Sequence, residues 1–176
     1  YVENNKKIII GTTGFSEKQY SKLISILDQK VPSLITSNFS IGMNFLYRLS
    51  ELVGLLPEEF EISINEKHHS KKIDSPSGTA LSLAKIISES KGYENLIFDR
   101  SKHGKREKSE LEVTSERIGG TPGIHEVNIA GQYEILRLEH IAFSRLAFAR
   151  GALSAAHWLH NVSEPRIYSM QDVISR

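Results

Sequence analysis

Cysteine is absent from the 176 residues of this sequence. Disulfide bonds, zinc–thiolate sites and cysteine nucleophiles are therefore excluded, and the absence is compatible with a reducing compartment. Long hydrophobic runs are also missing, because no apolar stretch approaches the roughly 20 residues that a membrane-spanning helix needs. The chain opens with the polar residues YVENNKK, so we expect no signal peptide within the sequence given. Because it opens with Tyr1 rather than methionine, we expect further residues upstream.

A clear excess of charge of one sign is missing as well. Lys and Arg number 22 against 21 Asp and Glu, which leaves a formal net charge of +1. The 39% hydrophobic and 24% charged residues are ordinary for a globular protein, and the length suits one domain, or one and a half, with a buried core. The overall charge gives no argument for nucleic-acid binding, so any basic patch must be local.

The first third of the chain alternates between strand and helix patterns. The run KKIIIG is short, apolar and ended by Gly11, which predicts a buried strand. Ser16 and Gln19 have the spacing of a capping box at a helix start. A second strand pattern, VPSLITSNFS, and a second helix pattern from Phe45 to Val53 follow. This order predicts a parallel α/β unit.

The remainder of the chain predicts a different sheet. Alternating apolar residues in FEISINE predict a half-buried strand, and a helix follows that Gly92 is placed to end. Gly131-Gln132 has the position of a tight hairpin turn. The expected elements after that first strand are a helix over 80–91, strands over 110–118, 125–130 and 133–140, and an alanine-rich helix over 144–160. We therefore expect an α/β chain, with an α+β part built on a mostly antiparallel sheet.

The stretch KHHSKKIDSPSGTA, residues 67–80, carries the chemistry. Free N–H groups and the helix dipole make the first turn of a helix an anion site. Gly78 allows a ligand close to the backbone there, and Ser77 and Thr79 add hydroxyl donors. A plain helix cap is the alternative explanation for these three residues.

Cationic and titratable side chains crowd the residues just before that helix. His68 and His69 titrate near neutrality and can deliver a proton. Lysines such as Lys72 can fix a carboxylate, and Asp74 could hold one of the cations in place. A solvated basic turn is the alternative. The two features together favour a site for a small anionic substrate.

Two other site classes find weaker support. His68 and His69 are neighbours in a strand and face opposite ways, and His125 and His140 have no metalloenzyme spacing. We therefore expect no metal. The basic segment KHGKREK has no interleaved aromatic residues, so we expect no nucleic-acid partner, and we also expect no membrane partner.

EKHHSKKIDSPSGTA resembles the signature of bacterial dihydrodipicolinate reductase, also called 4-hydroxy-tetrahydrodipicolinate reductase, an NAD(P)H-dependent enzyme of diaminopimelate and lysine biosynthesis. The similarity covers essentially the whole chain in the family's order. Its other blocks are GTTGFS (11–16), SNFSIGMN (37–44), ERIGGTPGIHEV (116–127) and EHIAFSRLAFARGALSAAHWL (139–159).

The resemblance implies a role for each matching residue. His68 matches the proton-donating histidine and Lys72 the catalytic lysine. The substrate's carboxylates would be bound by His69, Ser77, Gly78 and Thr79. The NADH or NADPH cofactor would be contacted by Gly11, Thr12, Thr13, Ser37, Asn38, Phe39 and Arg145. Hydride would pass to C4 of a cyclic imine with two carboxylates, after loss of the 4-hydroxyl as water.

The resemblance also implies a domain organisation. Residues 1–39 would be the C-terminal part of a Rossmann-type dinucleotide-binding domain, whose parallel sheet is partial here. Residues 40–144 would form the substrate-binding and tetramerisation domain, and residues 145–176 a closing helix and tail that return to the first domain. A cytoplasmic homotetramer, assembled through the antiparallel sheet, is implied as well.

The glycine-rich turn of a dinucleotide fold, G-x-G-x-x-G, is not present in the sequence. Relative to the family pattern, at least about 60 residues would precede Tyr1, at roughly 30 residues per βαβ unit. We therefore expect this chain alone to bind cofactor poorly and to have little activity. The alternative function is a catalytically incompetent substrate-binding and assembly domain. A semialdehyde or glyceraldehyde-phosphate dehydrogenase is excluded, since those enzymes need a cysteine.

Overall fold

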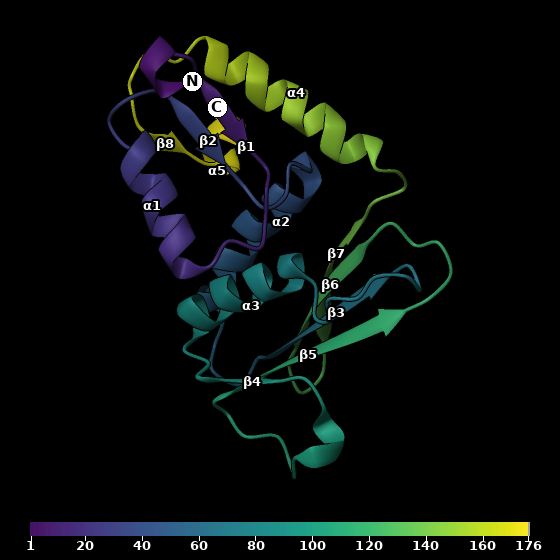
Figure 1. The fold of residues 1–176 in the computed structure, drawn as a ribbon. Coiled ribbons are helices and arrows are strands. Elements are labelled where there is room, and N and C mark those ends of the chain that lie inside the picture. Colours follow the sequence, from purple (N-terminus) through teal and green to yellow (C-terminus); the bar gives the residue numbers. More distant parts are fainter. Residues whose placement is uncertain (176) are drawn as a thin grey trace. The chain divides into compact units, whose positions relative to one another are not determined.

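A computed structural model describes residues 1–175 of the chain. These residues form two compact units, one made of residues 1–45 with 146–175 and the other of residues 46–145. Figure 1 shows the elements of both units. Among the described residues, no helix combines the length and the apolar character that crossing a membrane requires. The domain boundaries expected from the resemblance stay a prediction.

The first unit is built on a parallel sheet of three short strands in the order β1-β2-β8. They are β1 (Ile8–Ile10), β2 (Ser33–Ile35) and β8 (Ile167–Tyr168). Its helices are α1 (Glu17–Leu27), α4 (Leu146–His160) and α5 (Met170–Ile174), with a short 3₁₀ turn η1 (Val2–Asn4). The helix α2 (Ile41–Glu51) begins in this unit and ends in the next.

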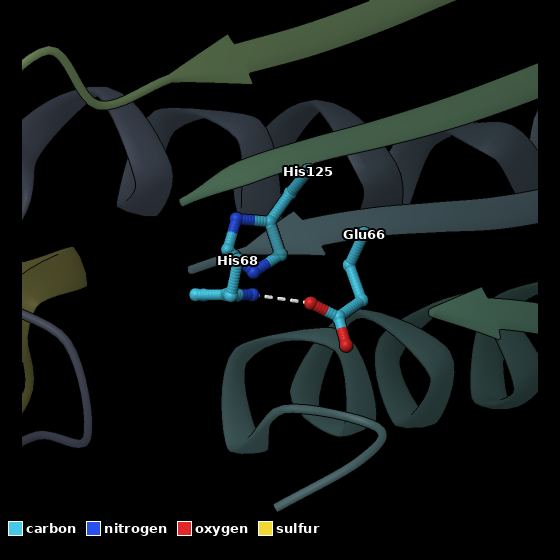
Figure 2. A group of neighbouring side chains, drawn as sticks. All are labelled: Glu66, His68 and His125. Atoms are coloured by element: carbon cyan, nitrogen blue, oxygen red, sulfur yellow. Dashed lines mark hydrogen bonds and ion pairs between the residues drawn. The ribbon is translucent and has the colours of Figure 1, made fainter. Parts of the chain in front are cut away.

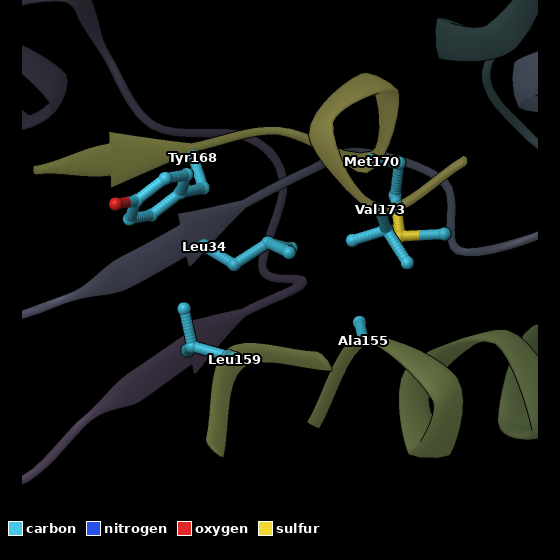
Figure 3. Packing of buried hydrophobic residues seen from close by; sticks show 6 residues of the cluster. All are labelled: Leu34, Ala155, Leu159, Tyr168, Met170 and Val173. Atoms are coloured by element: carbon cyan, nitrogen blue, oxygen red, sulfur yellow. The ribbon is translucent and has the colours of Figure 1, made fainter. Parts of the chain in front are cut away.

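The core of the first unit lies between the sheet and two helices (Figure 3). Leu34 of β2 and Tyr168 of β8 form one cluster with Ala155 and Leu159 of α4 and with residues of α5, and all four are nearly inaccessible to solvent. Residues from both ends of the chain share this core, so the C-terminal segment completes the sheet that the N-terminal strands begin.

The second unit is built on a five-stranded mixed sheet in the order β4-β5-β3-β6-β7. The central strand β3 pairs parallel with β5 and antiparallel with β6. Helix α3 packs on β3 and β5 through Ala80, Leu83, Ala84 and Ile87. The elements are η2 (Leu52–Leu55), β3 (Glu61–His68), α3 (Gly78–Lys91), β4 (Asn95–Ile97), η3 (Arg100–Lys102), β5 (Glu110–Arg117), β6 (Ile124–Ala130) and β7 (Ile135–Ile141).

The local signals in the sequence are confirmed at several helix ends. Ser16 and Gln19 form the capping box of α1, and Gly92 ends α3 with a left-handed φ of 81°. The connection between β6 and β7 is longer than the predicted turn at Gly131-Gln132: Ala130 pairs with Ile135, and the Gly131 N–H donates to the Glu134 carbonyl over 2.9 Å. The strands β4 and β8 and the helix α5 were not predicted.

Candidate active site

The site begins on the buried face of β3. Burial alternates along this strand, so that Ile62, Ile64, Glu66 and His68 share the inner face. The first two are core residues, whereas the last two place a carboxylate and an imidazole at the carboxyl end of the strand. Glu66 is 1% exposed. A carboxylate at such a depth needs partners that compensate for its lost hydration.

Glu66 has partners from three segments. Its Oε2 is hydrogen-bonded to His68 Nδ1 (Figure 2). Its Oε1 accepts from Arg117 Nη2 of β5 over 2.9 Å and from the Ser77 backbone N–H over 3.3 Å. Burial raises the pKa of this carboxyl, but the hydrogen bonds, above all those from His68 and Arg117, outweigh it and lower the pKa to about 2. Glu66 is therefore ionised at neutral pH.

His125 of β6 lies beside His68, and their ring centroids are 5.1 Å apart in an edge-to-face arrangement (Figure 2). Its Nε2 is 3.3 Å from the Ser77 hydroxyl. Burial, together with the charge of His68, lowers the pKa of His125 to about 3. The second imidazole is therefore neutral at physiological pH and leaves proton transfer to other groups.

The predicted helix N-terminus is where α3 begins. Ser77 is the N-cap, and its hydroxyl accepts from the Ala80 N–H over 3.2 Å. The cap that was the alternative explanation is thus present, and Ser77 itself is 2% exposed. Gly78 is exposed, and a β-carbon built on it would meet nothing within 4 Å. The first turn of this helix can therefore accept an anion at Gly78 and Thr79.

Lys72 is held by a neighbour, as the sequence suggested. Its Nζ donates to both carboxylate oxygens of Asp74 over 2.7 and 2.8 Å. The hydrogen bond from Lys72 lowers the pKa of Asp74. The backbone carbonyl of Asp74 in turn accepts from Arg117 Nη2 over 2.7 Å. Arg117 therefore connects the segment that carries Lys72 to the carboxylate that holds His68.

A hollow of about 410 Å³ lies beside the residues that follow His68 in the chain. His69, Lys71 and Arg145 supply cationic or titratable groups to it. Gly119 and Gly120 form another part of its wall, and the Gly119 carbonyl accepts from the Ser70 N–H over 3.1 Å. The structure thus brings Arg145, expected at the cofactor, to the same hollow as His69.

The residues expected at the cofactor in the first unit follow β1 and β2. Thr12, Thr13 and Ser37 line a hollow of about 450 Å³ together with Phe15 and Tyr20. It lies at the carboxyl ends of parallel strands, where open α/β sheets bind ligands.

The other three residues expected at the cofactor, Gly11, Asn38 and Phe39, make packing contacts and hydrogen bonds within the protein. Asn38 is 8% exposed, and its Oδ1 accepts from the Ser40 N–H over 2.9 Å. A β-carbon on Gly11 would lie 2.5 Å from the Phe39 ring. Gly11, Asn38 and Phe39 therefore shape the loops around the hollow.

Comparison with known proteins decides the family. The profile described as "Dihydrodipicolinate reductase, C-terminus" matches residues 42–174. The chain belongs to the dihydrodipicolinate reductase family. It is 40% identical to the 4-hydroxy-tetrahydrodipicolinate reductase of Rickettsia rickettsii, over 98% of this chain and 70% of that protein. It is also 40% identical to the reductase of Buchnera aphidicola subsp. Cinara cedri, over 99% of this chain and 65% of that protein.

A solved structure has the same fold. The dipicolinate-bound dihydrodipicolinate reductase from a Paenisporosarcina species superposes with a TM-score of 0.75 at 23% identity, over 98% of this chain and 66% of that one. The chain therefore spans about two thirds of the length of its reductase relatives. The resemblance inferred from the sequence motifs is confirmed.

Two residues of this candidate site were not among the predicted ones. Glu66 precedes His68 by two positions on the same face of a strand, and the alternation of FEISINE could have marked it. Arg117 lies opposite His68 in the parallel pairing of β3 with β5, 49 residues later. No local sequence pattern predicts that β3 pairs with β5.

Glu66, His68 and His125 also satisfy the distance requirement of a metal site, since one ligand atom from each lies within 4.8 Å of the others. The Glu66 carboxylate, however, already accepts from Arg117 and from the Ser77 N–H. A guanidinium on the same carboxylate competes with a cation for it. Within residues 1–175 we therefore describe this reductase-family cluster as a hydrogen-bonded ion-pair network.

Proposed function

We propose that this chain is the substrate-binding part of a 4-hydroxy-tetrahydrodipicolinate reductase and carries its proton-donating residues. The observation that carries the proposal is the His68–Glu66 pair, buried beside the first turn of α3 in a chain of this family. A titratable imidazole next to an anion-binding helix end suits a dianionic substrate that takes up a proton. The proposed place of this chemistry is diaminopimelate and lysine biosynthesis in the cytoplasm.

The substrate's carboxylates would be held by cationic and N–H groups. Gly78 and Thr79 offer backbone N–H groups in the first turn of α3, and Ser77 fixes that turn as its cap. The Thr79 hydroxyl would add a side-chain donor to the substrate's carboxylate. His69 would bind from the hollow that it lines. Preorganised donors of this kind bind charge without reorganising when the reaction occurs.

Two residues would act on the reacting ring. His68 would deliver the proton that the developing enamine takes up, and Lys72 would balance the negative charge. Because Asp74 holds Lys72 through two hydrogen bonds, the ammonium is fixed in position before substrate arrives. A fixed charge stabilises a transition state more effectively than a mobile one.

NADH or NADPH would supply the hydride when bound. The hydroxyls of Thr12, Thr13 and Ser37 line a hollow of about 450 Å³ at the carboxyl end of the parallel sheet, which suits one end of a dinucleotide. Gly11, Asn38 and Phe39 would shape the loops that carry these hydroxyls. Arg145, which lines the hollow of His69, stays a predicted cofactor contact. The sequence has no glycine-rich turn for the pyrophosphate, so we expect weak cofactor binding by this chain alone.

Calorimetric titration with pyridine-2,6-dicarboxylate tests the substrate site. We expect the chain to bind this planar dianion, and we expect His69→Ala or Thr79→Ala to weaken binding by about tenfold or more, since each removes a charge-assisted or hydroxyl hydrogen bond worth roughly 1.5–3 kcal/mol. Lys85→Ala is the control, because Lys85 is an exposed lysine on α3 whose ion pair with Glu89 is long at 3.9 Å. A folded chain that does not bind the dianion would contradict the proposal.

A second titration, with NADH present, separates the two candidate functions. If NADH leaves dicarboxylate binding unchanged, the chain is a substrate-binding and assembly domain that cannot catalyse the reaction by itself. The match of the family's C-terminal profile to residues 42–174 favours that candidate. If NADH tightens dicarboxylate binding, the residues of this chain hold the cofactor and the prediction of weak cofactor binding is wrong.

We further propose that the mixed sheet assembles a homotetramer through β7. This strand is at the sheet edge, and Ile135 and Leu136 on it are 62% and 53% exposed. Phe143, just beyond the strand, is 90% exposed. Exposed apolar groups along an edge strand are a common basis for association.

Sedimentation analysis of Leu136→Lys tests this assembly. A lysine at the centre of an apolar interface must be desolvated without a partner, so we expect the tetramer to dissociate into smaller species. Leu55→Lys is the matched control, because Leu55 is 82% exposed but belongs to η2 and not to the edge strand β7. A monomeric native chain, or a Leu136→Lys variant that remains tetrameric, would contradict the proposed interface.

A further inference from the structure

We infer that Glu66 is a positioning residue of the proposed reaction, one that fixes the ring proton of His68 on Nδ1 and leaves Nε2 as the atom that gives the substrate its proton. The inference rests on the proposed function for its catalytic meaning. Its geometric basis is the hydrogen bond between Glu66 Oε2 and His68 Nδ1 (Figure 2).

The ionisation of Glu66 determines the direction of this hydrogen bond. An ionised carboxylate has no proton to donate, so every partner of Glu66 must be a donor. Arg117 and the Ser77 N–H are donors in any state. His68 must therefore carry a proton on Nδ1 whether its ring is neutral or charged. When the ring gives up a proton to the substrate, Nε2 is the nitrogen that releases it.

The two oxygens of Glu66 have separate tasks. Oε2 holds the imidazole, whereas Oε1 accepts from both Arg117 and the N–H of the α3 N-cap. One buried side chain thereby joins the proton donor to the helix end that would bind the substrate's carboxylates. The same Arg117 Nη2 donates to the Asp74 carbonyl, next to the carboxylate that holds Lys72. Both proposed catalytic groups are thus linked to the same ion pair, Glu66–Arg117.

The environment of the ring adds a second constraint. A β-carbon on Gly123 would lie 3.1 Å from His68 Nε2, so the glycine leaves the space that this nitrogen needs. The edge-to-face contact with His125 limits rotation of the ring. Only 11% of the His68 side chain is exposed. The ring is therefore held in one orientation, and Glu66 decides which of its nitrogens is protonated there.

For the isosteric variant Glu66→Gln, the structure predicts a change of the His68 tautomer. Arg117 and the Ser77 N–H both donate to the Oε1 side, so the side-chain amide introduced by this substitution must turn its oxygen toward them. The NH₂ group of that amide then faces His68 Nδ1 as a donor. A donor at that position requires Nδ1 to be the acceptor. The neutral ring is therefore expected to change from the Nδ1–H to the Nε2–H tautomer.

Long-range ¹H–¹⁵N NMR spectra of the histidine rings measure this directly. The His68 signals are identified by their loss in His68→Gln, and the tautomer is read at alkaline pH. We expect Nδ1–H in the native chain and Nε2–H in Glu66→Gln. The control Glu110→Gln alters a carboxylate that is 7% exposed and paired with Arg100 over 2.9 Å, and it should leave the His68 tautomer unchanged.

Each outcome bears on one claim. An Nε2–H tautomer in the native chain overturns the inference, and this measurement needs no variant to fold. The inference is also overturned if the native chain and Glu66→Gln have the same tautomer. A tautomer switch in a chain that binds pyridine-2,6-dicarboxylate supports both claims. A switch without dicarboxylate binding overturns the proposed function instead, and with it the catalytic meaning of Glu66. If Glu66 had only a structural role, Glu66→Gln would change the stability of the fold but would not switch the His68 tautomer.

Discussion

Lowering the pH from 7 to 4.5 is expected to destabilise this protein by about 3 kcal/mol more than it destabilises a His125→Gln variant. The cause is the buried imidazole of His125, whose pKa is lowered from 6.5 to about 3 by burial and by the nearby His68. In the unfolded chain this imidazole takes up a proton below pH 6.5, whereas in the folded chain it remains neutral until about pH 3.

The sign follows from proton uptake. Between these two pKa values the unfolded state binds one more proton than the folded state, so the free energy of unfolding falls as the pH falls. At about 1.4 kcal/mol per pH unit, the loss reaches at most about 5 kcal/mol near pH 3. The contribution of the neutral His125 imidazole to the free energy of unfolding is fully present above pH 6.5. The groups around His125 are Glu66 and His68 of β3, His140 of β7 and Lys72.

Urea unfolding at pH 7 and at pH 4.5 measures the effect. At pH 4.5 the Glu66 carboxylate, with its pKa of about 2, is still ionised, so the difference between native chain and His125→Gln reports His125. Glutamine can keep a hydrogen bond to Ser77 without titrating. His103→Gln, at an exposed loop histidine, is the control and should keep the native pH dependence. Parallel pH profiles of the native chain and His125→Gln would contradict the buried neutral imidazole.

The elements with strong local patterns could be predicted from the sequence. The alternation in β3 identified the strand that ends at His68, and the glycine at 92 marked the end of α3. The resemblance of EKHHSKKIDSPSGTA to the reductase family identified the family and the fold class. These signals lie within a few residues of one another, where backbone periodicity and capping chemistry act.

The features that could not be predicted depend on distant pairings. β4 and β8 have three and two residues, too few for a period to be visible. Arg117 meets Glu66 only because β5 pairs parallel with β3. Ser77 was assigned to the substrate, but its hydroxyl is already engaged by Ala80 and His125. In each case tertiary contacts decide what the side chain does.

The last prediction concerns Phe39, which the sequence assigned to the cofactor and which the structure packs between two glycines. Gly11, at the end of β1, leaves room for the Phe39 ring, and Gly151 of α4 faces the Phe39 backbone. A β-carbon at 151 would overlap with the Phe39 carbonyl oxygen, which is backbone and cannot rotate away. The two glycines therefore decide how the loop after β2 lies on α4.

Gly151→Ala is expected to destabilise the unit of residues 1–45 and 146–175 by at least about 3 kcal/mol, the upper end of ordinary overpacking. The higher helix propensity of alanine recovers at most about 1 kcal/mol. For a chain of this size each kcal/mol corresponds to roughly 2–4 °C, so the melting temperature should fall by about 6–12 °C. Calorimetric melting measures this change. In contrast, Gly104→Ala, where a β-carbon meets nothing within 4 Å, should melt within a degree or two of the native chain.

A Gly151→Ala variant with native melting would mean that α4 does not lie against the Phe39 backbone. A variant that melts early while keeping its dicarboxylate affinity is the result the structure leads us to expect, because Gly151 and the residues proposed to bind substrate belong to different units. Any effect of this glycine on the reaction would then act through the loop that carries Phe39. That outcome would make Phe39 a residue that shapes the predicted cofactor loop through packing, whereas the sequence motif alone suggested a contact with the cofactor.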